Sequence, residues 1–120
     1  KRLPSTSCLG REDGGFMLGL NGGIRLWYIE GINNMRYGKY RFFCEVEALD
    51  MDPYNGDGYI FMSIDRQILK IIRFKNHKRM LYDVTYEKGY KFMKPVMQNH
   101  EVVYELDFKY LVALLECPVV

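Results

Sequence analysis

The stretch ILKIIRFKNHKRMLYDVTY, residues 68–86, decides the fold of this chain. Residues 68–75 and 79–86 are rich in β-branched and aromatic side chains, which favour extended strands. Asn76-His77 lies between them, and a short polar connection between two such runs is typical of a hairpin turn. The stretch therefore predicts an antiparallel hairpin, beside which the other elements can be placed.

Further strands are predicted on both sides of this hairpin. Asn21-Gly22 separates the apolar runs 16–20 and 24–29 and tolerates positive φ at both positions, so a hairpin is expected here too. Residues 52–58, DPYNGDG, have dense turn chemistry, and a strand is expected at about 58–64. Lys88-Gly89 predicts another turn, followed by a short strand at about 90–93 that Pro95 ends.

Residues 38–50 are compatible with two structures. Phe42, Phe43, Val46 and Leu49 have the spacing of the apolar stripe of an amphipathic helix. However, the apolar residues from Tyr40 onward also alternate with charged ones, as in a half-buried strand, and the residue types favour a strand. From the residues alone both alternatives stay open.

A final helix is predicted near the end of the chain. Glu105 or Asp107 can begin it, because carboxylates are favourable at the positive end of the helix dipole. Its apolar stripe consists of Phe108, Leu111, Val112 and Leu115, and Pro118 ends it. The predicted fold is therefore α+β, an antiparallel sheet of four to five strands with two helices packed on it.

The length of 120 residues predicts a single domain. Residues 1–16 are expected to be a polar N-terminal extension, residues 17–117 the domain and residues 118–120 a C-terminal tail. Three cysteines without CxxC spacing suggest reduced thiols. The N-terminus lacks the apolar core of a secretory signal and no apolar run approaches about 20 residues, so a cytoplasmic location is expected.

The basic residues are concentrated in one third of the chain. Nine lysines and arginines and three carboxylates lie between Asp65 and Lys94, a local charge of +6 in a chain whose net charge is +2. Such segregation can create a positive face that neutralises nucleic-acid phosphates. The candidate nucleic-acid-binding residues are Arg36, Arg66, Lys70, Arg73, Lys75, Lys78 and Arg79. On a strand, Lys70 would share a face with Ile72, and Arg73 and Lys75 would project from the other face. The alternative interpretation is a solvated hairpin whose charges protect an edge strand.

The sequence contains no recognisable catalytic motif. His77 and His100 have no neighbouring nucleophile motif, and the sequence has no G-x-S-x-G, H-E-x-x-H or phosphate-binding loop. Asp50, Asp52 and Asp57 surround a turn, where aspartate is expected for its backbone hydrogen bonds. The prediction is a protein that is not an enzyme, with no cofactor and no metal site.

A series of short landmarks resembles a known family. They are IRLWY (24–28), NMRYG (34–38), DPYNG (52–56), YIF (59–61), LKII (69–72) and EKGYKF (87–92). Their order and spacing are similar to those of the accessory protein encoded by the second open reading frame of insertion-sequence-66 transposons, often called TnpB. Arg36 lies in the landmark at 34–38. Members of this family have an aspartate at the first position of that landmark, where this chain has Asn34. The resemblance covers about residues 17–117 and favours a helix at 38–50.

What the resemblance implies is a bacterial accessory protein needed for transposition beside a separately encoded DDE transposase. The expected function is non-catalytic assistance of transposition, by non-specific DNA binding through the basic hairpin. The expected partners are DNA and the transposase of the same element, with no membrane. The alternative is a protein–protein adaptor that docks on the transposase or associates with itself through an aromatic surface or an exposed strand edge.

Overall fold

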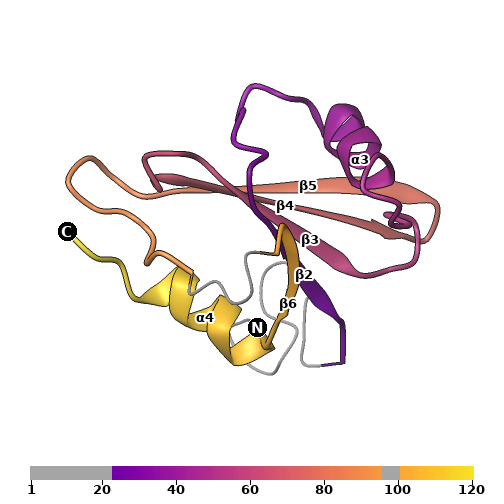
Figure 1. Ribbon diagram of the computed structural model, residues 1–120. Helices are drawn as coiled ribbons and strands as arrows, with labels where there is room; N and C mark the ends of the chain where they lie inside the picture. The colour runs from indigo at the N-terminus through magenta and orange to yellow at the C-terminus, as the bar shows by residue number, and fades with distance from the viewer. Residues whose placement is uncertain (1–22, 96–100) are drawn as a thin grey trace, which may run out of the picture.

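A single five-stranded sheet forms the centre of the computed structural model, which describes residues 23–95 and 101–120 (Figure 1). The strands lie in the order β5-β4-β3-β2-β6, with one helix on each face. The elements are β2 (Leu26–Ile29), α3 (Lys39–Glu47), β3 (Gly58–Met62), β4 (Ile68–Lys75), β5 (Lys78–Thr85), β6 (Val103–Leu106) and α4 (Phe108–Glu116). The α+β class predicted from the sequence is confirmed.

The sheet is mixed, whereas the sequence predicted an antiparallel one. β2 pairs with β3 in parallel, with Leu26 opposite Gly58 and Tyr28 opposite Ile60. The other three pairings are antiparallel. The parallel pair follows from α3, because two parallel strands need a long crossover connection and a helix supplies it. A helix that connects two neighbouring strands therefore implies that these strands are parallel.

The predicted hairpin at 68–86 is confirmed. β4 and β5 pair over their full lengths, from Ile68 opposite Thr85 to Lys75 opposite Lys78. Asn76 and His77 close the turn with φ of 52° and 62°. Positive φ at both central positions matches the twist of the two strands, and asparagine tolerates it better than most residues.

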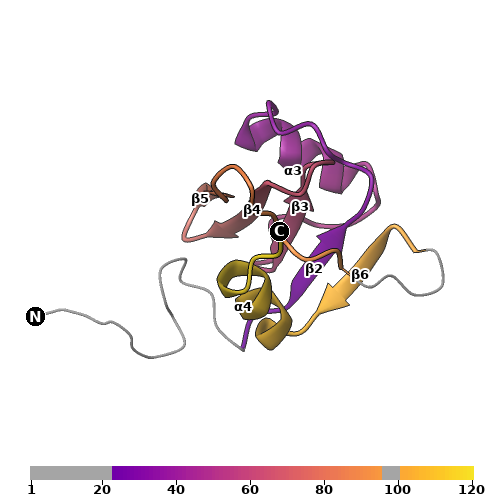
Figure 2. The same ribbon diagram turned by 90° about the vertical axis from the view of Figure 1, so that its left-hand side faces the viewer.

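One face of the sheet is covered by α3 (Figure 1, Figure 2). Phe42, Phe43 and Val46 of α3 are fully buried against Phe61 and Ile72 of the sheet. The ring centroids of Phe42 and Phe61 lie 4.5 Å apart. The helical alternative for residues 38–50 is thus the correct one, because the stripe at i, i+1 and i+4 places these three side chains on the sheet.

The opposite face is covered by α4 (Figure 2). Leu111, Leu114 and Leu115 are its buried residues, and Asp107 is the residue before its first turn. The predicted start at Asp107 is confirmed, although its side chain makes no capping hydrogen bond. The Tyr86 hydroxyl donates to the carbonyl oxygens of Leu114 and Leu115 (3.0 and 2.9 Å), which ties the end of this helix to the strand edge.

Three other expectations had different outcomes. The strand β6 was not predicted, because its four residues directly precede the helix and its acidic Glu105 suggested a helix start. The short strand at 90–93 is wrong: only Lys91 forms an isolated bridge, with Val119. The predicted strand at 16–20 and its Asn21-Gly22 turn lie outside the described residues, as does the extension 1–16. Within the described residues, β2 pairs with β3 on one edge and with β6 on the other.

The turn chemistry of residues 52–58 is confirmed. The Asp52 carboxylate accepts a hydrogen bond from the Tyr54 backbone N–H (2.9 Å), and the Asn55 side-chain oxygen accepts one from that of Asp57 (2.9 Å). The Tyr59 hydroxyl is hydrogen-bonded to the Asp52 carbonyl (2.8 Å). Aspartate and asparagine therefore shape this loop, as their local hydrogen-bonding preference predicts.

Candidate nucleic-acid interface

The seven candidate binding residues do not form one surface. Lys75, Lys78 and Arg79 lie at the tip of the β4–β5 hairpin, Lys70 and Arg73 lie within β4, and Arg36 and Arg66 lie at the other end of β4. The eight residues of β4 span roughly 26 Å. The structure therefore divides the basic segment into parts that must be assessed separately.

Lys70 is bound within the fold. Its side chain is 12% exposed, its Nζ donates to the Met35 carbonyl oxygen (2.7 Å), and it lies 3.6 Å from the Asp83 carboxylate. The first contact joins β4 to the loop after β2, and the second joins β4 to β5. A buried ammonium must find such partners because an unpaired buried charge is costly. Lys70 is thus placed as a structural cross-link, on the face shared with Ile72 as predicted.

Arg73 is also bound within the fold. Only 8% of the residue is exposed, and its Nε donates to the Gly56 carbonyl oxygen (3.0 Å). The guanidinium thereby holds the loop before β3 against β4. The prediction that Arg73 projects from the ribbon to meet phosphates is wrong, since strand parity gave its face but could not show that a loop covers it.

Arg79 lies over three aromatic rings. Its guanidinium carbon is 5.0 Å from the ring centroid of Tyr40, 5.3 Å from that of Tyr54 and 6.0 Å from that of Phe43. Its Nε and Nη2 donate to the Tyr54 hydroxyl (3.4 and 3.3 Å), and this hydrogen bonding raises the pKa of Arg79 above its already high ordinary value. The guanidinium is charged, exposed and held in place by the rings.

Two residues of α3 join this cluster. Lys39 Nζ lies 3.5 Å from the Arg79 carbonyl oxygen, and the Tyr40 ring is 64% exposed. Lys75 and Lys78 face each other across the first pair of the hairpin and are exposed. We call this group the hairpin-tip surface. It consists of Lys39, Tyr40, Tyr54 and Arg79 on the α3 face of the sheet, and of Lys75 and Lys78, which project from the opposite face.

The four cations of the hairpin-tip surface have no carboxylate partner in the described part of the chain. The ion pairs among described residues involve Arg25, Arg41 and Lys70 instead. Lys75 and Lys78 are like charges placed directly opposite each other, an arrangement that costs a few tenths of a kcal/mol or more unless an anion lies between them. Their charges are thus available to a polyanion.

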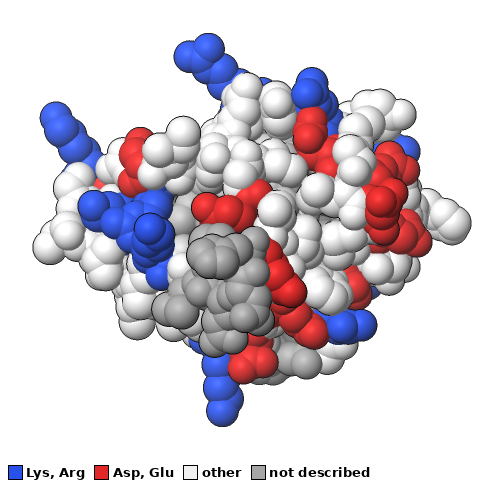
Figure 3. Space-filling model, in the orientation of Figure 1, with Lys and Arg blue, Asp and Glu red and all other residues white. Residues whose placement is uncertain are grey.

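Carboxylates limit the direction from which a polyanion can approach. In the orientation of Figure 3, acidic side chains gather on the right, the side on which the α3–β3 loop lies in Figure 1. That loop carries Asp50, Asp52 and Asp57. Basic and acidic side chains are interspersed over the rest of this face. This view shows no broad basic face. Tyr54 of the same loop contacts Arg79, so the loop that carries these carboxylates borders the hairpin-tip surface.

Arg36 and Arg66 lie near the β3–β4 turn. The Arg36 backbone N–H donates to the Asn34 side-chain oxygen (3.0 Å), so Asn34 shapes the turn that the landmark spans. Arg66 has a φ of +61° and lines a pocket at this end of the sheet. Neither residue can act together with the hairpin tip on a short stretch of phosphates.

Several other features bear on function. In residues 23–95 and 101–120, no group of three His, Cys, Asp or Glu side chains is arranged to hold a metal ion. Neither described helix has the length and apolar character that a membrane crossing requires. Cys44 and Cys117 are exposed free thiols.

Comparisons of the chain with protein-family models, curated proteins and solved structures gave no match.

The sequence interpretation missed Lys39, Tyr40 and Tyr54 as members of the site. Tyr54 was assigned to a turn and Tyr40 to either element of an ambiguous segment. No local signal was present, because Tyr40, Phe43 and Tyr54 lie 25 or more positions before Arg79 in the sequence. Their proximity to Arg79 depends on how α3 packs across β4 and β5, which local pattern does not give.

Proposed function

We propose that this protein is a non-catalytic binder of DNA that contacts the phosphate backbone through the hairpin-tip surface. The observation that supports this most is the set of four cations without a described carboxylate partner at one end of the sheet. Lys39 and Arg79 lie on the face that α3 covers, beside the exposed ring of Tyr40, and Lys75 and Lys78 project from the opposite face. Lysine and arginine bind phosphates by neutralising charge and releasing counterions, without reading sequence.

Tyr40 gives the surface a second mode of contact. An exposed aromatic ring can stack on a base of a frayed or single-stranded segment, and the neighbouring guanidinium of Arg79 can contact the adjacent phosphate. Because Arg79 is already held by Tyr40 and Tyr54, little side-chain freedom is lost on binding. We therefore expect tighter binding to DNA with single-stranded ends than to a blunt duplex of equal charge.

The proposed cellular role is assistance of transposition. It rests on the resemblance of the landmark series to the insertion-sequence-66 accessory family, and it predicts that the DNA is held beside a DDE transposase. Within that role, the hairpin-tip surface would position DNA while the transposase carries out strand transfer.

The test is a titration of fluorescently labelled DNA at several salt concentrations. Four phosphate contacts predict that log K falls with log[salt] with a slope of about −3.5 on duplex DNA, a loss of roughly a hundredfold between 50 and 200 mM salt. Affinity that is independent of salt, or absent at the lowest salt, would refute the proposal.

A matched pair of variants separates the surface from net charge. Lys75→Glu with Lys78→Glu removes two cations of the tip, and Lys88→Glu with Lys109→Glu changes the net charge equally at exposed sites elsewhere. The tip variant should reduce the magnitude of the slope by about 2, and the control by much less. Equal losses in both variants would show that only net charge matters.

A second candidate function is self-association through the outer edge of β5. The Tyr86 N–H donates to the Gln67 carbonyl (2.9 Å), which extends the hydrogen-bond ladder between β4 and β5 by one pair. Because backbone groups alternate in direction along a strand, those of Val84, Tyr82, Met80 and Lys78 also point toward β4. Arg79, Leu81, Asp83 and Thr85 therefore direct their backbone groups outward. No described strand pairs with this edge.

The charges on β5 select one register for such a dimer. If two copies pair antiparallel with Leu81 opposite Leu81, Arg79 of each copy lies opposite Asp83 of the other, on the same face. Arg79→Asp or Asp83→Arg alone should then abolish the dimer, and mixing the two variants should restore it as a heterodimer in sedimentation. A monomeric wild-type protein at high concentration would eliminate this candidate.

A further inference from the structure

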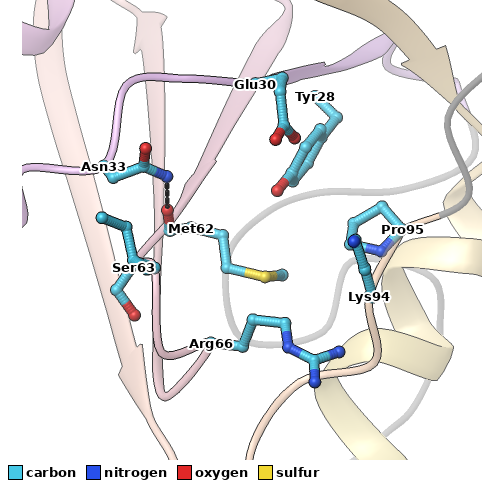
Figure 4. A pocket seen from close by; sticks show the side chains of 9 residues that line it. Tyr28, Glu30, Asn33, Met62, Ser63, Arg66, Lys94 and Pro95 are labelled. Atoms are coloured by element: carbon cyan, nitrogen blue, oxygen red, sulfur yellow. Dashed lines mark hydrogen bonds between the residues drawn. The ribbon is translucent and has the colours of Figure 1, made fainter.

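A pocket of about 230 Å³ lies at the end of the sheet opposite the hairpin tip (Figure 4). Its walls come from the end of β2, the loop after it, the β3–β4 turn and residues 94–95. Five of its polar side chains are Tyr28, Glu30, Asn33, Arg66 and Lys94, and Met62 forms an apolar wall between them.

The two ends of the pocket differ in charge. Arg66 and Lys94 lie on one side, and Glu30 and Asn33 lie on the other (Figure 4). Neither cation forms an ion pair with Glu30, although all three line one small pocket. Opposite charges that share a pocket without meeting leave room for a molecule that carries both complementary charges.

The neutral groups add one acceptor and one donor to the pocket. The Asn33 side-chain N–H donates to the Met62 carbonyl (2.8 Å), which leaves its side-chain oxygen as an acceptor beside Glu30. Tyr28 is only 4% exposed, and its hydroxyl points into the pocket without a hydrogen-bond partner among the described residues. Burial raises the pKa of Tyr28, so the hydroxyl keeps its proton and can donate.

Arg66 is held in its place by the backbone. Its N–H donates to the Ser63 carbonyl (3.0 Å) and its carbonyl accepts from the Phe92 N–H (2.7 Å). The residue has a φ of +61°, a conformation that arginine adopts at a cost and that asparagine adopts readily. The guanidinium has no described partner, so its contribution to the fold does not explain why arginine stands here.

We propose that this pocket binds a free α-amino acid, with its carboxylate on Arg66 and Lys94 and its ammonium on Glu30 and the Asn33 oxygen. The Tyr28 hydroxyl donates to the bound carboxylate. Met62 and Pro95 provide apolar surface for an aliphatic side chain. The pocket is separate from the hairpin-tip surface, so this binding does not depend on the proposed DNA contact.

The test is a titration of the isotope-labelled protein with L-leucine, followed by NMR at the amides of Tyr28 and Arg66. Saturable shifts with a dissociation constant of about 1 mM or tighter are expected. N-acetyl-L-leucine lacks the ammonium and isoamylamine lacks the carboxylate, and both should bind at least fivefold more weakly. Inorganic phosphate tests a plain anion site.

Two variants assign the contacts. Arg66→Asn keeps a residue suited to the left-handed conformation, and Glu30→Gln keeps the shape of the side chain. Each of these two variants should weaken leucine binding at least fivefold. The control variant Lys88→Gln, at an exposed site elsewhere, should leave leucine binding unchanged. Because Glu30→Gln leaves the β3–β4 turn intact, it keeps the test decisive if Arg66→Asn fails to fold. Absence of saturable shifts up to about 20 mM would overturn the proposal. Binding of phosphate or N-acetyl-leucine at the strength of leucine would overturn it too.

Discussion

Replacing Lys70 by methionine tests whether the middle of the basic segment is structural. Methionine keeps an unbranched apolar stem but removes the ammonium that donates to the Met35 carbonyl at 2.7 Å. Loss of a hydrogen bond from a charged group costs about 1.5–3 kcal/mol. The Asp83 carboxylate is 52% exposed, so its loss of a partner 3.6 Å away adds little. The expected destabilisation is about 2 kcal/mol.

The assay is urea unfolding followed by circular dichroism, with thermal unfolding as a second readout. About 2 kcal/mol corresponds to a fall in melting temperature of roughly 8 °C for a domain of this size. Lys75→Met, at an exposed position in the same strand, is the control and should change stability by less than about 0.5 kcal/mol. Salt-dependent DNA binding should be weakened by the control and kept by Lys70→Met. A stable Lys70→Met protein that has lost DNA binding would refute the division of the segment.

Three further predictions concern the turn, the core and the buried tyrosines. His77→Gly should stabilise the protein by about 0.5–1 kcal/mol in urea unfolding, because His77 has a φ of 62° that glycine adopts without strain. Phe42→Ala should destabilise it by about 3–5 kcal/mol, because Phe42 is fully buried between α3 and β3, whereas Cys44→Ala at an exposed position of the same helix should have little effect. Burial raises the pKa of Tyr59 and of Tyr104 from 10.0 to about 12, so the folded state keeps protons that the unfolded state releases. The stability they contribute is full below pH 10 and is lost as the pH rises to about 12. A pH series of urea unfolding curves measures this decline in the free energy of unfolding, and Tyr59→Phe should reduce it.

Local pattern predicted the elements of this fold better than their arrangement. The 68–86 hairpin and the last helix follow from residue types and apolar spacing, and the structure has them where expected. The helix at 39–47 was one of two alternatives that the residues alone left open. The parallel pairing of β2 with β3 depends on a crossover, and β6 completes the sheet with only four residues. Non-local pairing of this kind leaves little trace in a short window, because the same residues would fit another strand partner.

The candidate site was predicted in part. Strand alternation gave the correct faces for Lys70 and Arg73, but their burial comes from the loops that contain Met35 and Gly56. Tyr54 lies beside Arg79 for the same reason, since residues 25 positions apart meet only in the folded chain. Charge counting along the sequence therefore overestimates how many cations of a basic segment can reach a ligand.

Amide chemical shifts on addition of a short DNA duplex would test the central claim most directly. That claim is that the protein binds DNA through the hairpin tip and holds Lys70 and Arg73 within its fold. The predicted result is a set of shifts at Lys39, Tyr40 and residues 75–79, with the amides of Lys70 and Arg73 nearly unchanged. Shifts centred on Arg36 and Arg66, or no shifts at low salt, would contradict it.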